Sequence, residues 1–273
     1  MQPAVWRLVK TAAAPGSWNM AVDEAILESV GQQFVLPTLR LYAWEPACLS
    51  LGFAQSIKDV DHTALEQYGW QLVRRPTGGR AILHTDELTY SVIAPLDEPR
   101  VAGGVLESYS RLSGALLNAL ERLGLPARAD KEHDLPPGTQ PSGPVCFEVP
   151  SNYEITANGK KLVGSAQARR KEGVLQHGSL PMYGDLTRIT QALRYPSEAE
   201  RARAGERLLA HATNLEMLGT SADWESCAKA FESAFCAVLN ITFREEPLTA
   251  LEQRRAEALA AEKYASAAWN ERV

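Results

Sequence analysis

The sequence predicts an α+β fold in which helices flank a mostly antiparallel sheet. Three observations support this prediction. Strand-like runs follow one another across short turns, as in hairpins. Helical patterns are gathered in separate runs and do not alternate regularly with the strands. The 273 residues are 45% hydrophobic and 22% charged, the composition of an ordinary globular domain.

The first half of the chain is expected to hold strands with two intervening helices. Its elements are a strand at 5–11, a helix from Ser17 (the expected N-cap) to 32, short strands at 38–46 and 48–53, a helix at 61–68, and two strands within 70–95 around a Gly78-Gly79 turn. An amphipathic helix then follows at 105–123, ended by Gly124. Its apolar side carries Leu106, Leu112, Leu116, Leu117 and Leu120.

A polar loop rich in proline and glycine is expected at 130–145, before a strand meander at 153–182. Asn158-Gly159 is a strong two-residue hairpin turn, and Glu172-Gly173 lies at the next reversal. The rest of the chain is mainly helical, with helices expected at 184–193, 197–209, 222–239 and 248–264.

Charge and targeting signals narrow the class of function. The net charge of −5 and the absence of a Lys/Arg block argue against a nucleic-acid partner. No signal peptide and no run of about 18 apolar residues is found, so we expect a cytoplasmic protein without a membrane span. The four cysteines form no CxxC pair, so we expect no metal site. Cys48, Cys227 and Cys236 are interpreted as core residues.

Two segments have the residues to bind an acyl substrate. In RRPTGGR, Gly78 and Gly79 let a ligand lie against the backbone and turn N–H groups toward an oxygen, and Arg75 adds positive charge. In GKKLVGSAQ, Gly164 and Ser165 are small enough to line a ligand chain. On the local sequence alone, a solvated hairpin turn explains the first segment about as well, and an ordinary edge strand with two surface lysines explains the second better.

A third segment contains Cys146, which follows the flexible loop and precedes Pro150. Reactive groups often lie at such junctions. A lone cysteine is nevertheless more often a small buried hydrophobe. The five histidines offer no obvious catalytic dyad, although His84 and His177 fall in strands near these segments.

Taken together, five segments resemble the lipoate/biotin protein ligase and transferase superfamily, in that family's order. They are NMAVDEA, RRPTGGRAILH, GKKLVGSAQARR, LQHGSLPM and KYASAAWNERV. Arg80, at the position of a third glycine in lipoate ligases, and CFEVPSNYE resemble the cysteine-dependent octanoyltransferase branch. The resemblance implies a mixed, mainly antiparallel sheet. It also implies that Cys146 is the acyl-thioester nucleophile and that Lys161 lowers the pKa of its thiol.

The substrates follow from the same resemblance. The octanoyl donor would be acyl carrier protein, whose phosphopantetheine carries the thioester, and the acceptor a lysine of a lipoyl domain such as glycine cleavage H protein. No other cofactor is expected, and the protein is expected to be a monomer. Arg75, Gly78, Gly79, His84, Gly164, Ser165 and Gln167 are the expected substrate-binding residues.

Residues 1–247 are expected to form the catalytic domain and 248–273 a helical extension. The chain ends four residues after Trp269, so no ligase-type accessory domain is expected. An ATP-dependent lipoate ligase and an amidotransferase acting between two lipoyl domains stay open as alternatives. So do a non-catalytic acyl-protein binder and a cysteine hydrolase. A biotin ligase is disfavoured because no GRGR-type loop is present.

Overall fold

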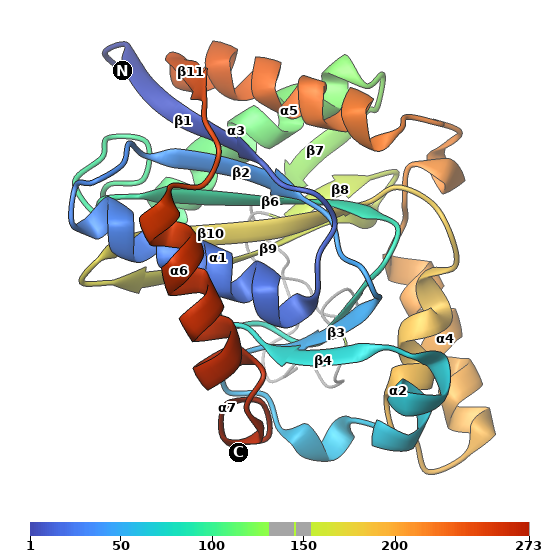
Figure 1. Cartoon of the computed structure of the whole chain (residues 1–273). Helices are drawn as coiled ribbons and strands as arrows, with labels where there is room; N and C mark the ends of the chain where they lie inside the picture. The colour runs from blue at the N-terminus through green and yellow to red at the C-terminus, as the bar shows by residue number, and fades with distance from the viewer. Residues whose placement is uncertain (131–144, 146–153, 273) are drawn as a thin grey trace.

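A mixed eight-stranded sheet runs through the middle of the molecule in the computed structural model, which describes residues 1–130, 145 and 154–272 (Figure 1). In spatial order the strands are β11 (Ile241–Glu245), β1 (Ala4–Lys10), β2 (Thr38–Tyr42), β6 (Glu87–Ala94), β10 (Gly173–Pro181), β9 (Lys160–Arg170), β8 (Glu154–Ala157) and β7 (Ala127–Asp130). β1 is parallel to both of its neighbours, and the other pairs are antiparallel. The predicted fold class is confirmed.

The hairpin expected around Gly78-Gly79 does not form, because its two strands belong to a second sheet. It contains β4 (Gln71–Arg74), β3 (Cys48–Leu51) and β5 (Ile82–His84), in that spatial order. The strands on either side of Gly78-Gly79 therefore do not pair with each other, because β3 lies between them. The glycine segment instead passes over the end of β3. We call residues 76–80 the glycine turn.

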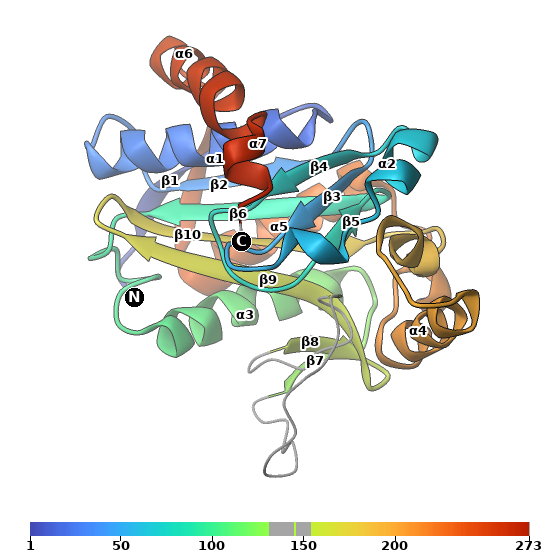
Figure 2. The ribbon, with the colours of Figure 1, turned by 90° about the horizontal axis from the view of Figure 1, so that it is seen from below.

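Helices cover both faces of the large sheet (Figure 2). α1 and α6 pack together on one face, and α3 and α5 pack together on the other. The helices are α1 (Gly16–Gly31), α2 (His62–Tyr68), α3 (Val105–Arg122), α4 (Glu198–His211), α5 (Trp224–Leu239), α6 (Ala250–Leu259) and α7 (Ala267–Asn270), with 3-10 turns η1 (Ile57–Asp59), η3 (Leu186–Ala192) and η4 (Glu216–Leu218), and a π-turn η5 (Ala260–Tyr264).

The beginning of α1 differs from the prediction. Ser17 is not the N-cap, because the helix starts at Gly16 after Pro15 and no side chain of its own segment caps it. The Gly16 N–H instead donates to Gln71 Oε1 at 3.0 Å. Since this acceptor comes from β4, no local signal announces it. The expected Asn158-Gly159 turn is confirmed, with φ values of 51° and 75°.

The amphipathic helix forms as α3, with one error in its buried face. Leu112, Leu116 and Leu120 are buried against the sheet and α5. Leu106 is 51% exposed, because the first turn of α3 extends beyond the core. Gly124 adopts a φ of 78° just past the helix, as a C-terminal glycine does.

The C-terminal segment is fastened to the rest of the chain by buried polar contacts. Arg7 of β1 and Glu252 of α6 form a fully buried ion pair at 2.6 Å. The Arg74 side chain donates to the backbone carbonyls of Asn270 and Arg272. These contacts hold the end of the chain against the second sheet. No helix in the described part of the chain is long and apolar enough to cross a membrane.

Candidate functional site

A small pocket lies between the glycine turn, the second sheet and the middle of β9 and β10. Counted with its mouth, it has a volume of about 390 Å³. Its walls are mostly carbon, with a few polar side chains. The lining residues are Tyr42, Trp44, Arg75, Gly79, Ile82, His84, Thr89, Gly164, Ser165, Ala166, His177, Gly178 and Ser179. We call it the inner pocket. Pockets that are mainly apolar with a few convergent polar groups are typical ligand sites.

Most of the substrate-binding residues expected from the sequence meet in this pocket. Arg75, Gly79 and His84 come from the second sheet and its connection, and Gly164 and Ser165 from β9. The remaining two lie elsewhere. Gly78 and Gln167 line a wider groove outside the inner pocket, which shares only Gly79 with it.

The two proposed catalytic residues differ in what the structure describes. Lys161 lies on β9 and is 5% exposed. Cys146 is outside the described residues, so its role stays a prediction. The residue before it, Val145, is buried and forms a parallel bridge with Ala81, directly after the glycine turn. Lys161 forms a similar bridge with Ala212, and both Val145 and Ala212 line one neighbouring pocket.

A buried chain of hydrogen bonds supports the glycine turn through Arg75. Its Nη1 donates to Ser50 Oγ at 2.6 Å, and Ser50 Oγ lies 2.6 Å from His84 Nε2. His84 Nδ1 in turn lies 2.7 Å from Glu87 Oε1. The other end of the guanidinium, Nη2, donates to the backbone carbonyls of Gly78 at 3.1 Å and Arg80 at 2.9 Å. Arg75 thus ties the turn to the second sheet.

These contacts define which nitrogen of His84 carries its proton. Burial alone would raise the pKa of Glu87, but the His84 ring and hydrogen bonds from His84, Thr89 and Ser179 hold it below its usual value. An ionised Glu87 only accepts hydrogen bonds, so His84 Nδ1 must donate. The Ser50 hydroxyl, which accepts from Arg75, lies 2.6 Å from the other ring nitrogen, Nε2. Both ring nitrogens are occupied, and the Trp44 indole stacks on the ring at 3.9 Å.

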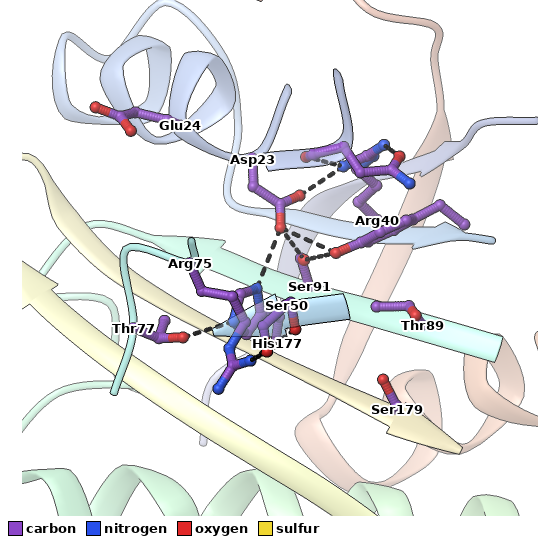
Figure 3. Close-up of polar contacts among 12 residues, drawn as sticks. Asp23, Glu24, Arg40, Ser50, Arg75, Thr77, Thr89, Ser91, His177 and Ser179 are labelled. Carbon is purple, nitrogen blue, oxygen red and sulfur yellow. Dashed lines mark hydrogen bonds and ion pairs between the residues drawn. The ribbon is translucent and has the colours of Figure 1, made fainter. Parts of the chain in front are cut away.

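A second buried chain reaches the glycine turn through Thr77 (Figure 3). Thr77 Oγ1 lies 2.7 Å from His177 Nε2, and His177 Nδ1 lies 3.4 Å from Asp23 Oδ2. Asp23 also accepts from Arg40 at 2.7 Å and from Ser91 at 2.6 Å. The chain therefore runs from α1 and β2, across β10, to the turn.

Burial and neighbouring charges determine the protonation of His177 and Asp23 in this second chain. Burial lowers the pKa of His177, and the charges of Arg75 and His84 add to this, against the opposing effect of Asp23. Burial pushes the pKa of Asp23 upward, but Arg40 and the hydrogen bonds from His177 and Ser91 hold it below its usual value. A neutral His177 donating from Nδ1 to an ionised Asp23 leaves Nε2 to accept the Thr77 hydroxyl proton.

The floor of the pocket depends on a glycine at its centre. In the sheet Gly178 lies between Tyr90 and Ser165. The Tyr90 hydroxyl reaches over it to Ser165 Oγ at 2.7 Å. A Cβ at Gly178 would lie 2.6 Å from Gly164 O and 2.7 Å from the Tyr90 ring. No side chain fits there, because Gly164 O, Ser165 Oγ and the Tyr90 ring already lie around that position.

The described cysteines are poor nucleophiles. Cys48 and Cys227 are fully buried, as predicted. Burial raises the pKa of Cys48 far above its usual value and that of Cys227 to about 12. Cys236 was also predicted to be a core residue but is partly exposed, and burial raises the pKa of its thiol. A nucleophilic thiolate is therefore not expected at any of these three.

The residues that support the pocket walls were not predicted. No histidine dyad is evident in the sequence, yet in the fold His84 pairs with Glu87 and His177 with Asp23. Only Glu87 had a local signal, since it follows His84 by three residues. Asp23 is 154 positions from His177 and becomes its partner through the fold. Among the described residues no group of three or more His, Cys, Asp or Glu is arranged to hold a metal ion.

Comparison with known proteins defines the class first. A family model described as the lipoyl protein ligase A/B catalytic domain matches residues 15–236. The chain belongs to this family. A bi-partite lipoate protein ligase from Thermoplasma acidophilum has the same fold, with a TM-score of 0.82 at 25% identity, covering 98% of this chain and 96% of that one.

Relatives with known names narrow the class further. The octanoyltransferase LipM of Kyrpidia tusciae is 41% identical over 276 residues, covering 98% of each chain. The octanoyltransferase LipM of Bacillus subtilis is 37% identical over 277 residues, covering 99% of each. The expected membership of the octanoyltransferase branch, and with it the class of acyltransferase, is confirmed.

Proposed function

We propose that this protein transfers an octanoyl group from acyl carrier protein to a lysine of a lipoyl domain, in lipoate biosynthesis. The observation that carries the proposal is the inner pocket, a narrow, mostly apolar space beside a glycine turn, in a chain about 40% identical to octanoyltransferases. A saturated acyl chain suits such walls. Burying its six methylenes contributes about 5 kcal/mol of binding free energy.

The transfer proceeds in two steps through Cys146. Its thiolate attacks the octanoyl thioester on the phosphopantetheine of the carrier protein, and the carrier leaves as a thiol. Val145, the residue before it in the sequence, forms a parallel bridge with Ala81, directly after the glycine turn. Lys161 favours the thiolate, since a neighbouring ammonium lowers the pKa of a thiol.

In the second step a lysine amine of the acceptor attacks the octanoyl-cysteine thioester. The product is an amide, and Cys146 is regenerated. Exchange between thioesters is nearly balanced, and conversion of a thioester to an amide is downhill. The reaction therefore needs no ATP. A lipoyl domain as acceptor is supported by the similarity to the Thermoplasma ligase, which was studied with its E2 lipoyl domain. We name glycine cleavage H protein as the expected acceptor.

The test is a transfer assay with octanoyl-carrier protein and apo-H protein, without ATP. We expect an octanoyl adduct on the acceptor lysine, and none with Cys146→Ala. Matched Cys236→Ala protein should transfer normally, because Cys236 lies on α5 and lines none of the pockets described above. A requirement for ATP and free lipoate would favour the ligase. Transfer only from an octanoylated lipoyl domain would favour the amidotransferase, release of free octanoate a hydrolase, and no reaction an acyl-protein binder.

A further inference from the structure

We propose that the backbone N–H of Gly79 donates a hydrogen bond to the carbonyl oxygen of the bound acyl group, and that Thr77 and Ser50 are positioning residues for it. The proposal rests on the proposed function, because it concerns the first chemical step of that reaction. In this role the two buried chains of hydrogen bonds that end at the glycine turn hold the Gly79 N–H in place. One chain ends on the Thr77 hydroxyl, and the other on the carbonyls held by Arg75.

The direction of the Gly79 N–H follows from the carbonyl of the same peptide. Gly78 O accepts from Arg75 Nη2 at 3.1 Å, so this carbonyl faces the guanidinium. The bond between Gly78 and Gly79 is trans, and in a trans peptide the N–H points opposite to the C=O. The Gly79 N–H therefore faces away from Arg75. Within the described part of the chain it has no acceptor.

The surroundings of Gly79 suit a substrate oxygen. Gly79 lines both the inner pocket and the groove outside it, so it lies where an acyl chain would enter. Its φ of 93° is in the region that favours glycine. Val145 reaches the same place, through its bridge to Ala81 two residues later.

Each buried chain constrains the turn from a different direction. Thr77 Oγ1 binds His177 on β10, on the side of the large sheet. Thr77 O accepts from Phe53 N at 2.9 Å, and Arg75 holds the following carbonyls from the second sheet. Both histidines act as connectors with their two nitrogens engaged. They are therefore positioning residues and not acid–base catalysts.

The step that this arrangement assists is the attack on the thioester. The cysteine thiolate adds to the carbonyl carbon, and the π pair moves to oxygen. When the carbonyl re-forms, the bond to the donor sulfur breaks and its electron pair leaves as a thiolate. One thiolate replaces another, and no proton is gained or lost overall. An N–H aimed at the oxygen stabilises the intermediate more than the substrate, and loss of one such donor typically slows acyl transfer about 10²–10³-fold.

Two rates measured on the same thiol test the proposal. Acylation by S-octanoyl-N-acetylcysteamine passes through an oxyanion, whereas alkylation by iodoacetamide does not. We expect Thr77→Val to slow acylation of Cys146 about 10-fold or more and to leave its alkylation rate within about 2-fold, because only part of the donor's effect is lost. Thr77→Ser, which keeps the hydroxyl, should recover most of the acylation rate. Thr190→Val is the control, since Thr190 is buried in η3 and lines none of the described pockets.

The other buried chain, through Arg75, Ser50 and His84, supplies an independent variant if Thr77→Val does not fold. Ser50→Ala removes the link between Arg75 and His84 and should show the same separation of the two rates. Acylation at the wild-type rate in both folded variants would overturn the inference. Equal losses of acylation and alkylation would also overturn it, because they would place the effect on the thiol. A wild-type protein that gains no octanoyl adduct would instead contradict the proposed function.

Discussion

Replacing Gly52, which does not itself line the inner pocket, by alanine moves the glycine turn. Gly52 follows β3, and a Cβ there would lie 1.8 Å from Gly79 O and 2.7 Å from Gly79 C. Ordinary van der Waals contact begins at 3.4 Å, so the shortfall at the oxygen is 1.6 Å. Both clashing atoms are backbone, and no side chain can rotate away. The turn itself must shift by about 1 Å, which in an active site costs roughly 100-fold in rate.

The assay for Gly52→Ala combines stability and transfer. Overpacking costs about 1–3 kcal/mol of the free energy of unfolding, which urea denaturation measures. Octanoyl transfer by the folded protein should fall about 100-fold. Gly114→Ala is the matched control, because its Cβ would lie 3.5 Å from Val238 in α5, far from the pocket. It should transfer normally and be stabilised by up to about 1 kcal/mol. Gly52→Ala with wild-type stability and activity would refute the reasoning.

Three further predictions concern stability. His177 has a lowered pKa in the folded protein, so between that pKa and the ordinary value of 6.5 the unfolded chain binds more protons. The free energy of unfolding should therefore decrease as the pH falls through about 6.5. In urea titrations from pH 5 to 8, His177→Gln should depend less steeply on pH than the wild type. Equal pH dependence in the two proteins would contradict a neutral His177. Glu252→Gln leaves Arg7 buried without its carboxylate partner and should lower the free energy of unfolding, measured in urea, by about 3–5 kcal/mol. A decrease below about 1 kcal/mol would contradict the burial of the pair. Gly178→Ala should lower the free energy of unfolding by about 1–3 kcal/mol, since its Cβ meets Gly164 O, and should abolish octanoyl binding. Unchanged binding of octanoate in calorimetry would place the ligand outside the inner pocket.

The elements predicted well are those specified by nearby residues. The Asn158-Gly159 turn and the buried side of α3 each follow from a local pattern. β11 was missed because Ile241–Glu245 is short and follows directly after α5. The glycine hairpin was wrong because its two flanking strands both pair with β3, an earlier part of the chain. Partner choice of this kind depends on the packing of the whole molecule.

The same distinction applies to the site. Arg75, Gly79 and Gly164, which line the inner pocket, lie in short motifs, so a resemblance finds them. Thr77 and His177 are 100 positions apart, and their contact exists only in the folded chain. A buried histidine in a strand gives no sign of whether it is packing or part of a hydrogen-bonded chain. The sequence therefore identifies residues that line the inner pocket, but not those that support them from the rest of the fold.

The measurement that tests the central claim most directly is the intact mass of the protein after mixing with octanoyl-carrier protein alone. We predict one added octanoyl group, mapped by peptide analysis to Cys146 and lost as apo-lipoyl domain is added, with a matching gain on its lysine. Cys146→Ala should gain none. An octanoyl adduct that persists in Cys146→Ala, or octanoylation of the lipoyl domain by that variant, would contradict the account.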